Sequence, residues 1–284
     1  MAAPLPTCHL DGALLPLGEA RVSPLDRGFL FGDAVYEVIA AHGGRLQRLH
    51  AHLARLERSL GELGIVNPHT RAQWQALLEA LLAANEAGDA YVYLQVTRGT
   101  EHGRNHAPPP GLVPTVFAFC SPLPVDPPTL LEHGIACITL PDTRWARCDI
   151  KSVALLANVL LRQQASDAGA AEAILLRDGF LTEASSAAVH VIVAGEIRTP
   201  PQGPRLLPGT TRGLVEDVAA AHGVPFRSVA ITEAELRSAD EVWLSAATRG
   251  VLPVTSLDGL PVGPGRPGAL WHRMRGWIDA SRRA

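Results

Sequence analysis

The sequence has almost no lysine: of its 25 lysine and arginine residues, only Lys151 is a lysine. Lysine is ordinarily among the commonest residues. Arginine can replace it wherever a positive charge is enough, but arginine keeps its proton and cannot act as a nucleophilic amine. Lys151 is therefore a candidate for a position that requires a primary amine. The alternative is a surface lysine retained by chance.

Long apolar runs and a strong excess of charge are also lacking. The longest apolar run, residues 153–161, is interrupted by Asn158 and is too short to span a membrane. The formal net charge of −3 gives no basic footprint for a nucleic acid. The first residues have neither the charged start nor the apolar stretch of a secretory signal. Because 47% of the 284 residues are hydrophobic, we expect a globular protein with no membrane or nucleic-acid partner.

Several motifs with well-known chemistry are missing as well. There is no HExxH metal motif, no GxSxG nucleophile turn, no Rossmann fingerprint and no Walker loop. We therefore expect no metal site. Neither a CxxC pair nor a disulfide framework is formed by the four cysteines, Cys8, Cys120, Cys137 and Cys148. They are typical of reduced thiols in a cytoplasmic protein.

Strand-like and helix-like segments alternate along the chain, which predicts an α/β (α+β) protein. Leucines spaced by three or four residues predict a helix over 49–63 that ends near Gly64. The proline-rich stretch 121–128 predicts a linker between an N-terminal domain, 1–120, and a C-terminal domain, 129–284. Further helices are expected at 71–85, 154–168 and 211–223, and strands at 91–96, 115–119, 135–140, 172–177, 189–193 and 241–244.

Lys151 directly precedes the apolar run, where desolvation can make an amine nucleophilic. Pyridoxal phosphate is the commonest partner of such a lysine, and it requires a carboxylate for its ring nitrogen and an anion site for its phosphate. Glu183 is the candidate carboxylate, although an exposed turn glutamate is the common case. The turn Pro208–Gly209 before Thr210 and Thr211 can present free N–H groups to an anion, or be an ordinary helix cap.

At these residues the sequence resembles the fold-type IV pyridoxal-phosphate enzymes, and among them the D-amino-acid aminotransferases. The matching segments follow one another in order over most of the chain. They are DRGFLFGDAVYE (26–37), HLAR (52–55), QVTRG (95–99), RNH (104–106), RCDIKS (147–152), LTEASS (181–186) and PGTTR (208–212).

The resemblance implies two α/β domains with the cofactor in the interdomain cleft, and the Schiff-base lysine in the C-terminal domain. It also implies a homodimer whose active site includes a loop of the other subunit. Lys151 would form the internal aldimine and move the substrate proton, and Glu183 would pair with the pyridine nitrogen. The other implied cofactor residues are Arg55, Thr210, Thr211 and Ser245 at the phosphate and Ser185 and Ser186 at the cofactor face; Tyr36 would help to bind the substrate carboxylate.

Arg104 and His106 point to the subfamily. A planar two-pronged donor suits an α-carboxylate, and the resemblance implies that this pair forms the carboxylate trap of D-amino-acid aminotransferases. The alternative is a flexible polar loop over 101–110. The sequence departs from the family pattern at Ala184, Ala187 and Ala188 and at Ala246 and Ala247, where serine, glycine, asparagine or hydroxyl residues are usual.

The expected function is transamination of a D-amino acid such as D-alanine with a 2-oxo acid such as 2-oxoglutarate, by ping-pong kinetics. The alternatives on the same scaffold are an aminodeoxychorismate lyase and a branched-chain or amine transaminase. A relative that binds the cofactor without turnover is disfavoured, because binding alone requires no amine.

Overall fold

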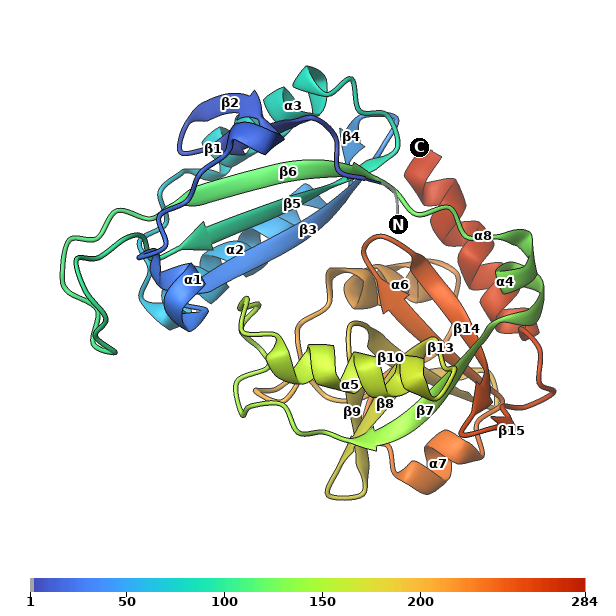
Figure 1. Cartoon of the computed structure of the whole chain (residues 1–284). Coiled ribbons are helices and arrows are strands. Elements are labelled where there is room, and N and C mark those ends of the chain that lie inside the picture. Colours follow the sequence, from blue (N-terminus) through green and yellow to red (C-terminus); the bar gives the residue numbers. More distant parts are fainter. Residues whose placement is uncertain (1–2, 284) are drawn as a thin grey trace. The chain divides into compact units, whose positions relative to one another are not determined.

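The computed structural model describes residues 3–283 and divides them into two compact units (Figure 1). Unit 1 contains the residues up to Pro124 together with Ile150–Ala154, and unit 2 contains Val125–Asp149 and the residues from Leu155 onward. The division after Pro124 falls inside the expected linker, 121–128.

Unit 1 is built on a six-stranded antiparallel sheet, and the helices α2 and α3 lie against one of its faces (Figure 1). Its strands, in sheet order, are β2 (Ala13–Pro16), β1 (Thr7–Leu10), β6 (Val116–Pro122), β5 (Ala90–Thr97), β3 (Ala34–His42) and β4 (Arg45–Leu46). Its helices are the 3-10 turn η1 (Leu17–Glu19), α1 (Arg27–Phe31), α2 (Leu49–Leu63) and α3 (Arg71–Ala84).

Local sequence explains the two long helices of unit 1. The leucine stripe of α2 enters the core through Leu53, Leu56 and Leu60, and the helix ends at Gly64 in the left-handed conformation that glycine tolerates best. At the start of α3, Thr70 forms a capping box with Gln73. Both helices therefore agree with the expectation from the sequence.

The segment Ile150–Ala154 belongs to unit 1, which corrects the expectation that the C-terminal domain carries Lys151. The reason is backbone pairing with the start of β3. The Tyr36 N–H donates to the Lys151 carbonyl at 3.0 Å, and the Val153 N–H donates to the Ala34 carbonyl at 3.1 Å. Neither contact is local in sequence, so no sequence pattern announces it.

Unit 2 contains a nine-stranded mixed sheet with helices around it. Its strands, in sheet order, are β12 (Phe226–Ser228), β11 (Glu196–Thr199), β10 (Ala188–Val193), β13 (Glu241–Ala246), β14 (Gly250–Leu257), β7 (Ile135–Pro141), β8 (Glu172–Arg177) and β9 (Phe180–Ala184), with β15 (Leu260–Pro261) paired to β14. Its helices are α4 (Pro128–His133), α5 (Leu156–Asp167), α6 (Thr210–Ala221), α7 (Glu233–Arg237) and α8 (Ala269–Arg283). The mixed α/β class that the sequence predicts is confirmed.

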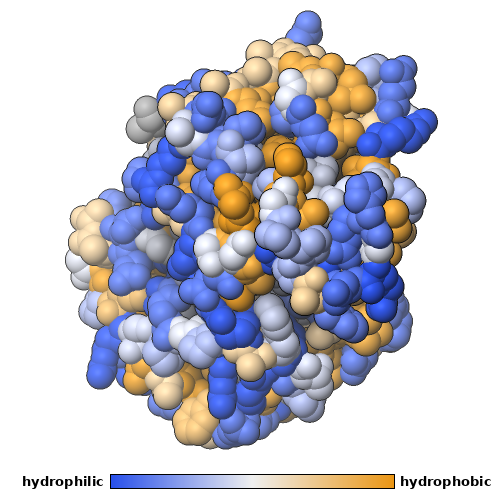
Figure 2. Space-filling model, turned by 90° about the vertical axis from the view of Figure 1, so that its left-hand side faces the viewer, coloured by the Kyte–Doolittle hydropathy of each residue, from blue (hydrophilic) through white to orange (hydrophobic). Residues whose placement is uncertain are grey.

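The apolar run after Lys151 differs from expectation, because α5 begins at Leu156 and the run is not buried as a whole. Leu161 and Ala165 pack against β8, whereas Leu156, Val159 and Leu160 are 72%, 59% and 56% exposed. Elsewhere on the surface, apolar side chains are interspersed with polar ones, as Figure 2 shows for one face. Within residues 3–283, no helix is both long and apolar enough to cross a membrane.

Candidate active site

The backbone of Lys151 is held by hydrogen bonds, and its side chain pairs with no carboxylate of the described residues. Its N–H donates to the Ser59 hydroxyl of α2 at 3.3 Å, and its carbonyl accepts from Tyr36. Its amine Nζ lies 4.0 Å from the centroid of the Tyr36 ring. Among the described residues, Lys151 has no ion pair. Unit 1 therefore presents a half-buried primary amine over an aromatic face.

A buried carboxylate, Glu37, organises the charges beside this lysine segment. Arg55 donates from Nε to Oε1 at 2.8 Å and from Nη2 to Oε2 at 2.7 Å, and Nδ1 of His52 lies 2.7 Å from Oε2. Burial alone would raise the pKa of Glu37, but the Arg55 guanidinium and His52 outweigh it and lower the pKa to about 2. Arg55 is thus a buried residue of the core side of α2 and not a surface arginine.

The Tyr36 ring stacks on Tyr93, with 5.7 Å between the ring centroids. Tyr93 in turn donates its hydroxyl to Gln95 at 2.7 Å, and burial raises its pKa to about 12. Tyr93 is therefore a neutral support for the Tyr36 ring at physiological pH.

Arg104 and His106, from the loop after β5, meet around the ring of Phe31. The guanidinium carbon of Arg104 lies 5.1 Å from the Phe31 centroid, and the His106 ring lies 5.6 Å from it. Both polar side chains are exposed. The loop contacts α1 through Phe31 and Arg27.

Unit 2 carries the candidate carboxylate, Glu183, buried on β9. Its oxygens accept from Arg144 Nη1 and from the Leu207 N–H, the latter at 3.2 Å. Burial raises the pKa of Glu183, and Arg144 works in the opposite direction. Arg144 is shared with Asp142, to which it donates at 2.8 Å and 2.9 Å. Glu183 is therefore a buried carboxylate whose arginine partner, Arg144, also pairs with Asp142.

The hydroxyls of Ser185 and Ser186 are occupied by another buried carboxylate, Glu172 of β8. Ser185 contacts Oε1, and Ser186 donates to Oε2 at 2.5 Å. Arg162 pairs with the same carboxylate at 3.4 Å. These two contacts tie the turn after Glu183 to β8, and the placement of Ser185 and Ser186 at the cofactor face stays a prediction.

The expected anion site lies at the N-terminus of α6, which begins at Thr210, one residue earlier than expected. Gly209 is the N-cap and supplies no side-chain hydrogen bond, and the side chains of Thr210 and Thr211 are buried. First-turn N–H groups of a helix have no partner within the helix, and the helix dipole favours a negative charge there. This helix start is suited to a phosphate.

Ser245, at the end of β13, contacts a buried histidine. His190 Nε2 lies 2.9 Å from the Ser245 hydroxyl, and burial followed by the charge of Arg212 lowers the pKa of His190 to about 3. His190 is consequently neutral at physiological pH. The next two residues, Ala246 and Ala247, bring no hydroxyl.

The profile of the family described as "Amino-transferase class IV" matches residues 34–257. The chain belongs to this family. Over 260 residues it is 42% identical to a D-alanine aminotransferase of Bacillus licheniformis, a match that covers 92% of this chain and 91% of the relative.

The fold is shared with solved branched-chain amino acid aminotransferases. That of Escherichia coli superposes with a TM-score of 0.91 at 23% identity, covering 97% of this chain and 94% of the other. A second such enzyme, solved with pyridoxamine 5'-phosphate, gives 0.90 at 24% identity with the same coverage. The expected fold-type IV family is confirmed.

Sequence reasoning missed several buried residues that contact the candidate residues within each unit: Arg27 and Glu37 in unit 1, and Arg144, Glu172 and His190 in unit 2. Each acts through a partner distant in sequence, such as Arg144 with Glu183. The one available signal was local: Glu37 and Arg27 both lie in the segment 26–37, which also contains Tyr36.

Proposed function

We propose that this chain is a pyridoxal-phosphate aminotransferase that moves the amino group of a D-amino acid such as D-alanine to a 2-oxo acid such as 2-oxoglutarate. The observation that carries the proposal is Lys151: the chain's only lysine is half-buried, unpaired with any described carboxylate, and placed over Tyr36. The identity to a D-alanine aminotransferase along nearly the whole chain supports the reaction and the substrate class.

The donor sets of the two units fit the cofactor group by group. Lys151 supplies the amine that would bond to the aldehyde carbon. Glu183, buried and only partly neutralised by Arg144, suits a protonated pyridine nitrogen. The uncapped start of α6 with Thr210 and Thr211, together with Arg55 and Ser245, would hold the phosphate. The carbonyls and hydroxyls around Ser185 and Ser186 keep Glu183 in position.

When bound, the cofactor withdraws electrons from the bond between the substrate's Cα and its hydrogen. Lys151 would accept that proton at its Nζ and later release it, as a base whose amine has no ion pair among the described residues. Glu183 would hold a proton on the pyridine nitrogen, since a buried carboxylate disfavours the loss of that proton. Arg104 and His106 bind the α-carboxylate, with Tyr36 beside it, and so select the face of Cα that Lys151 meets.

The alternative reactions differ in whether the substrate has an α-carboxylate that Arg104 and His106 would bind. A lyase acting on aminodeoxychorismate and a branched-chain or amine transaminase share the lysine and the pyridine carboxylate. An amine transaminase has no α-carboxylate to hold, so the pair Arg104 and His106 around Phe31 favours an amino acid. The likeness to branched-chain enzymes, at 23–24% identity, concerns the fold.

The test compares pyruvate release from D- and L-alanine, with 2-oxoglutarate as acceptor, in the wild type and in Arg104→Ala. We expect a preference for D-alanine, and a loss of roughly tenfold to a hundredfold in kcat/KM for the variant, because one charge-assisted hydrogen bond is removed. An amine without a carboxylate should be indifferent to the substitution. A preference for L-alanine contradicts the D-specific assignment. Borohydride should separately fix the cofactor on the peptide that contains Lys151, and labelling of any other peptide contradicts the cofactor assignment.

We propose further that the enzyme is a cytoplasmic homodimer in which a loop of one subunit serves the site of the other. The exposed side chains of Leu156, Val159 and Leu160 share one face of α5 and give a dimer an apolar surface to cover. The four cysteines are free and buried, as suits a reducing compartment.

A further inference from the structure

Arg27 of α1 is a buried arginine whose three guanidinium nitrogens all have partners. Nε donates to Asp33 at 2.8 Å. Nη1 donates to the Asn105 carbonyl at 2.6 Å and pairs with Glu101 at 3.0 Å. Nη2 donates to the His106 carbonyl at 3.1 Å. The two carbonyls directly follow Arg104 in the chain, so one side chain fixes the backbone on which Arg104 and His106 stand.

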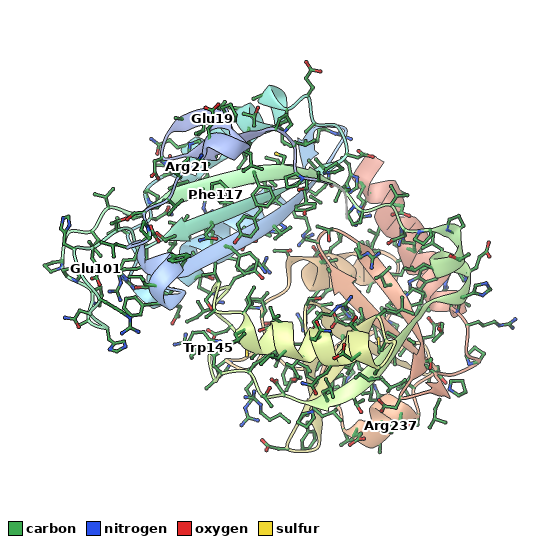
Figure 3. All side chains as sticks on the ribbon, viewed as in Figure 1. Glu19, Arg21, Glu101, Phe117, Trp145 and Arg237 are labelled. Carbon is green, nitrogen blue, oxygen red and sulfur yellow. The ribbon has the colours of Figure 1, made fainter. Side chains whose placement is uncertain are left out.

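Arg27 also pairs with the two neighbouring carboxylates, Asp33 and Glu101. Glu101 is 4% exposed, with one oxygen on Arg27 and the other accepting the Asn105 N–H at 3.1 Å. Figure 3 shows Glu101 at the start of the loop, on the side of α1. Burial would lower the pKa of Arg27, but Asp33 and Glu101 outweigh it and raise that pKa. Asp33 is held by Arg98 as well, at 2.7 Å.

Because Glu101 pairs with Arg27, it does not pair with Arg104. Glu101 lies three residues before Arg104, close enough along the chain to compete for it. Among the described residues, however, Arg104 has no ion pair, and its guanidinium lies over the Phe31 ring. The opposite pattern would bury the charge of Arg104 in a salt bridge within the loop. With Glu101 on Arg27, the guanidinium of Arg104 is exposed and available to an anion.

The Phe31 ring connects the two arginines. Arg27 lies 4.6 Å from its centroid and Arg104 5.1 Å from it. Attraction between a guanidinium and an aromatic face is weak at an exposed site. It can orient Arg104 without preventing it from binding a carboxylate.

We propose that Arg27 is a positioning residue for substrate recognition: it holds the Asn105 and His106 carbonyls and keeps Glu101 away from Arg104. Arg104 thereby stays free for the substrate's α-carboxylate. This inference rests on the proposed function, in which Arg104 and His106 bind that carboxylate.

The experiment uses the cofactor-loaded enzyme with Arg27→Gln, Arg27→Gln/Glu101→Gln, and Arg98→Gln as the matched control. Arg98 shares Asp33 with Arg27 but touches neither Glu101 nor the two loop carbonyls. Three quantities are measured: KM and kcat for D-alanine, the same for an amine without a carboxylate, and the Kd of pyruvate for the pyridoxal form, followed by absorbance.

In Arg27→Gln, the freed Glu101 should capture Arg104. KM for D-alanine and the Kd of pyruvate should rise on the order of tenfold, with kcat for the carboxylate-free amine nearly unchanged. Removing the competing charge in the double variant should restore the part of the affinity that is lost to Glu101, which a merely structural role for Arg27 does not predict, because Glu101→Gln returns none of the lost carbonyl contacts. Arg98→Gln should leave the Kd of pyruvate within about twofold, since its charge is not part of this competition.

Two results overturn the proposal while the proposed function stands: a wild-type KM in Arg27→Gln when Arg104→Ala raises it, or no recovery in the double variant. Arg104→Ala without effect on D-alanine overturns the proposed function instead. If Arg27→Gln is recovered unfolded, Arg27→Lys takes its place. It keeps a charge for Glu101 but cannot reach all four partners at once, so we expect a smaller rise in the same direction, and an unchanged KM overturns the proposal.

Discussion

Two buried carboxylates, Glu37 of unit 1 and Glu183 of unit 2, are each paired with an arginine, but their pKa values move in opposite directions. Glu37 has the whole fork of Arg55 and also His52, which lower its pKa to about 2 against burial. Burial raises the pKa of Glu183, and Arg144 does not offset this effect because it also pairs with Asp142. Glu183 thus gains from a further positive partner, which a protonated pyridine nitrogen would supply.

Replacing Glu183 by glutamine should leave the cofactor bound and slow the reaction. An amide cannot stabilise the pyridine proton, so the electron sink weakens. We expect kcat with D-alanine to fall by roughly a hundredfold to a thousandfold, the usual cost of removing one preorganised electrostatic group. The measurement is kcat beside cofactor content from absorbance. Glu241→Gln, a carboxylate that caps α8 in the same unit, is the control; a wild-type kcat in Glu183→Gln would exclude Glu183 from the reaction.

Glu37 should make the stability of the protein fall with acid. Its folded pKa of about 2 is below the ordinary 4.5, so its contribution is complete above about pH 4.5 and is lost as the pH falls toward 2. The shift corresponds to about 3 kcal/mol. We expect the loss of unfolding free energy between pH 5 and pH 3 to be smaller in Glu37→Gln than in the wild type.

The comparison is made by urea unfolding at each pH. At pH 7 the variant should already be less stable by about 3–5 kcal/mol, because Arg55 and His52 lose a buried partner. Other carboxylates with lowered pKa values, such as Asp33 and Asp142, contribute equally to both proteins. Parallel pH curves for wild type and variant would show that Glu37 is not the group responsible.

At the scale of helices and strands, local patterns were predictive wherever one face packs against a core. The strand 172–177 and the helix 49–63 have the bounds that the sequence predicts. The strands β3 and β14 were missed. The burial of β3 does not alternate cleanly, and β14 contains Pro253, so neither presents the period-two pattern of a half-buried strand.

The motif residues could be named from the sequence, but their partners could not, because pairs such as Arg144 with Glu183 depend on the tertiary fold.

The start of α6 should contribute to cofactor affinity through its hydroxyls as well as its backbone. Thr210→Val and Thr211→Val keep the shape and the helix but remove one hydroxyl each. A hydroxyl that bonds a charged phosphate is worth roughly 1.5–3 kcal/mol, so we expect each variant to weaken pyridoxal-phosphate binding by about tenfold or more. Affinity is measured by equilibrium dialysis. Thr70→Val, at the cap of α3 in unit 1, should cost stability but not affinity; unchanged affinity in both α6 variants would assign the phosphate to other residues.

At the scale of the whole molecule, the proposed roles are divided between the units and, in the proposed dimer, between the subunits. Unit 1 supplies Lys151 and, on a separate loop, Arg104. If that loop serves the other subunit, the lysine and the arginine of one working site come from different chains. Two inactive variants can then complement each other, which a site built from a single chain does not allow.

Lys151→Ala and Arg104→Ala are each expected to be poorly active with D-alanine at low substrate concentration. When equal amounts are unfolded together and refolded, about half of the dimers should be mixed, by random pairing of subunits in a symmetric dimer. In a mixed dimer one site receives both damaged residues and the other receives neither. About a quarter of the wild-type activity should therefore return, since half of the dimers have one of two sites intact. If Arg104 instead serves the Lys151 of its own chain, every site of the mixed dimer carries one damaged residue, and the mixture should show only the average of the two separate variants. A mixture prepared without unfolding, in which subunits have not exchanged, is the control, and recovery there would point to contamination and not to shared sites.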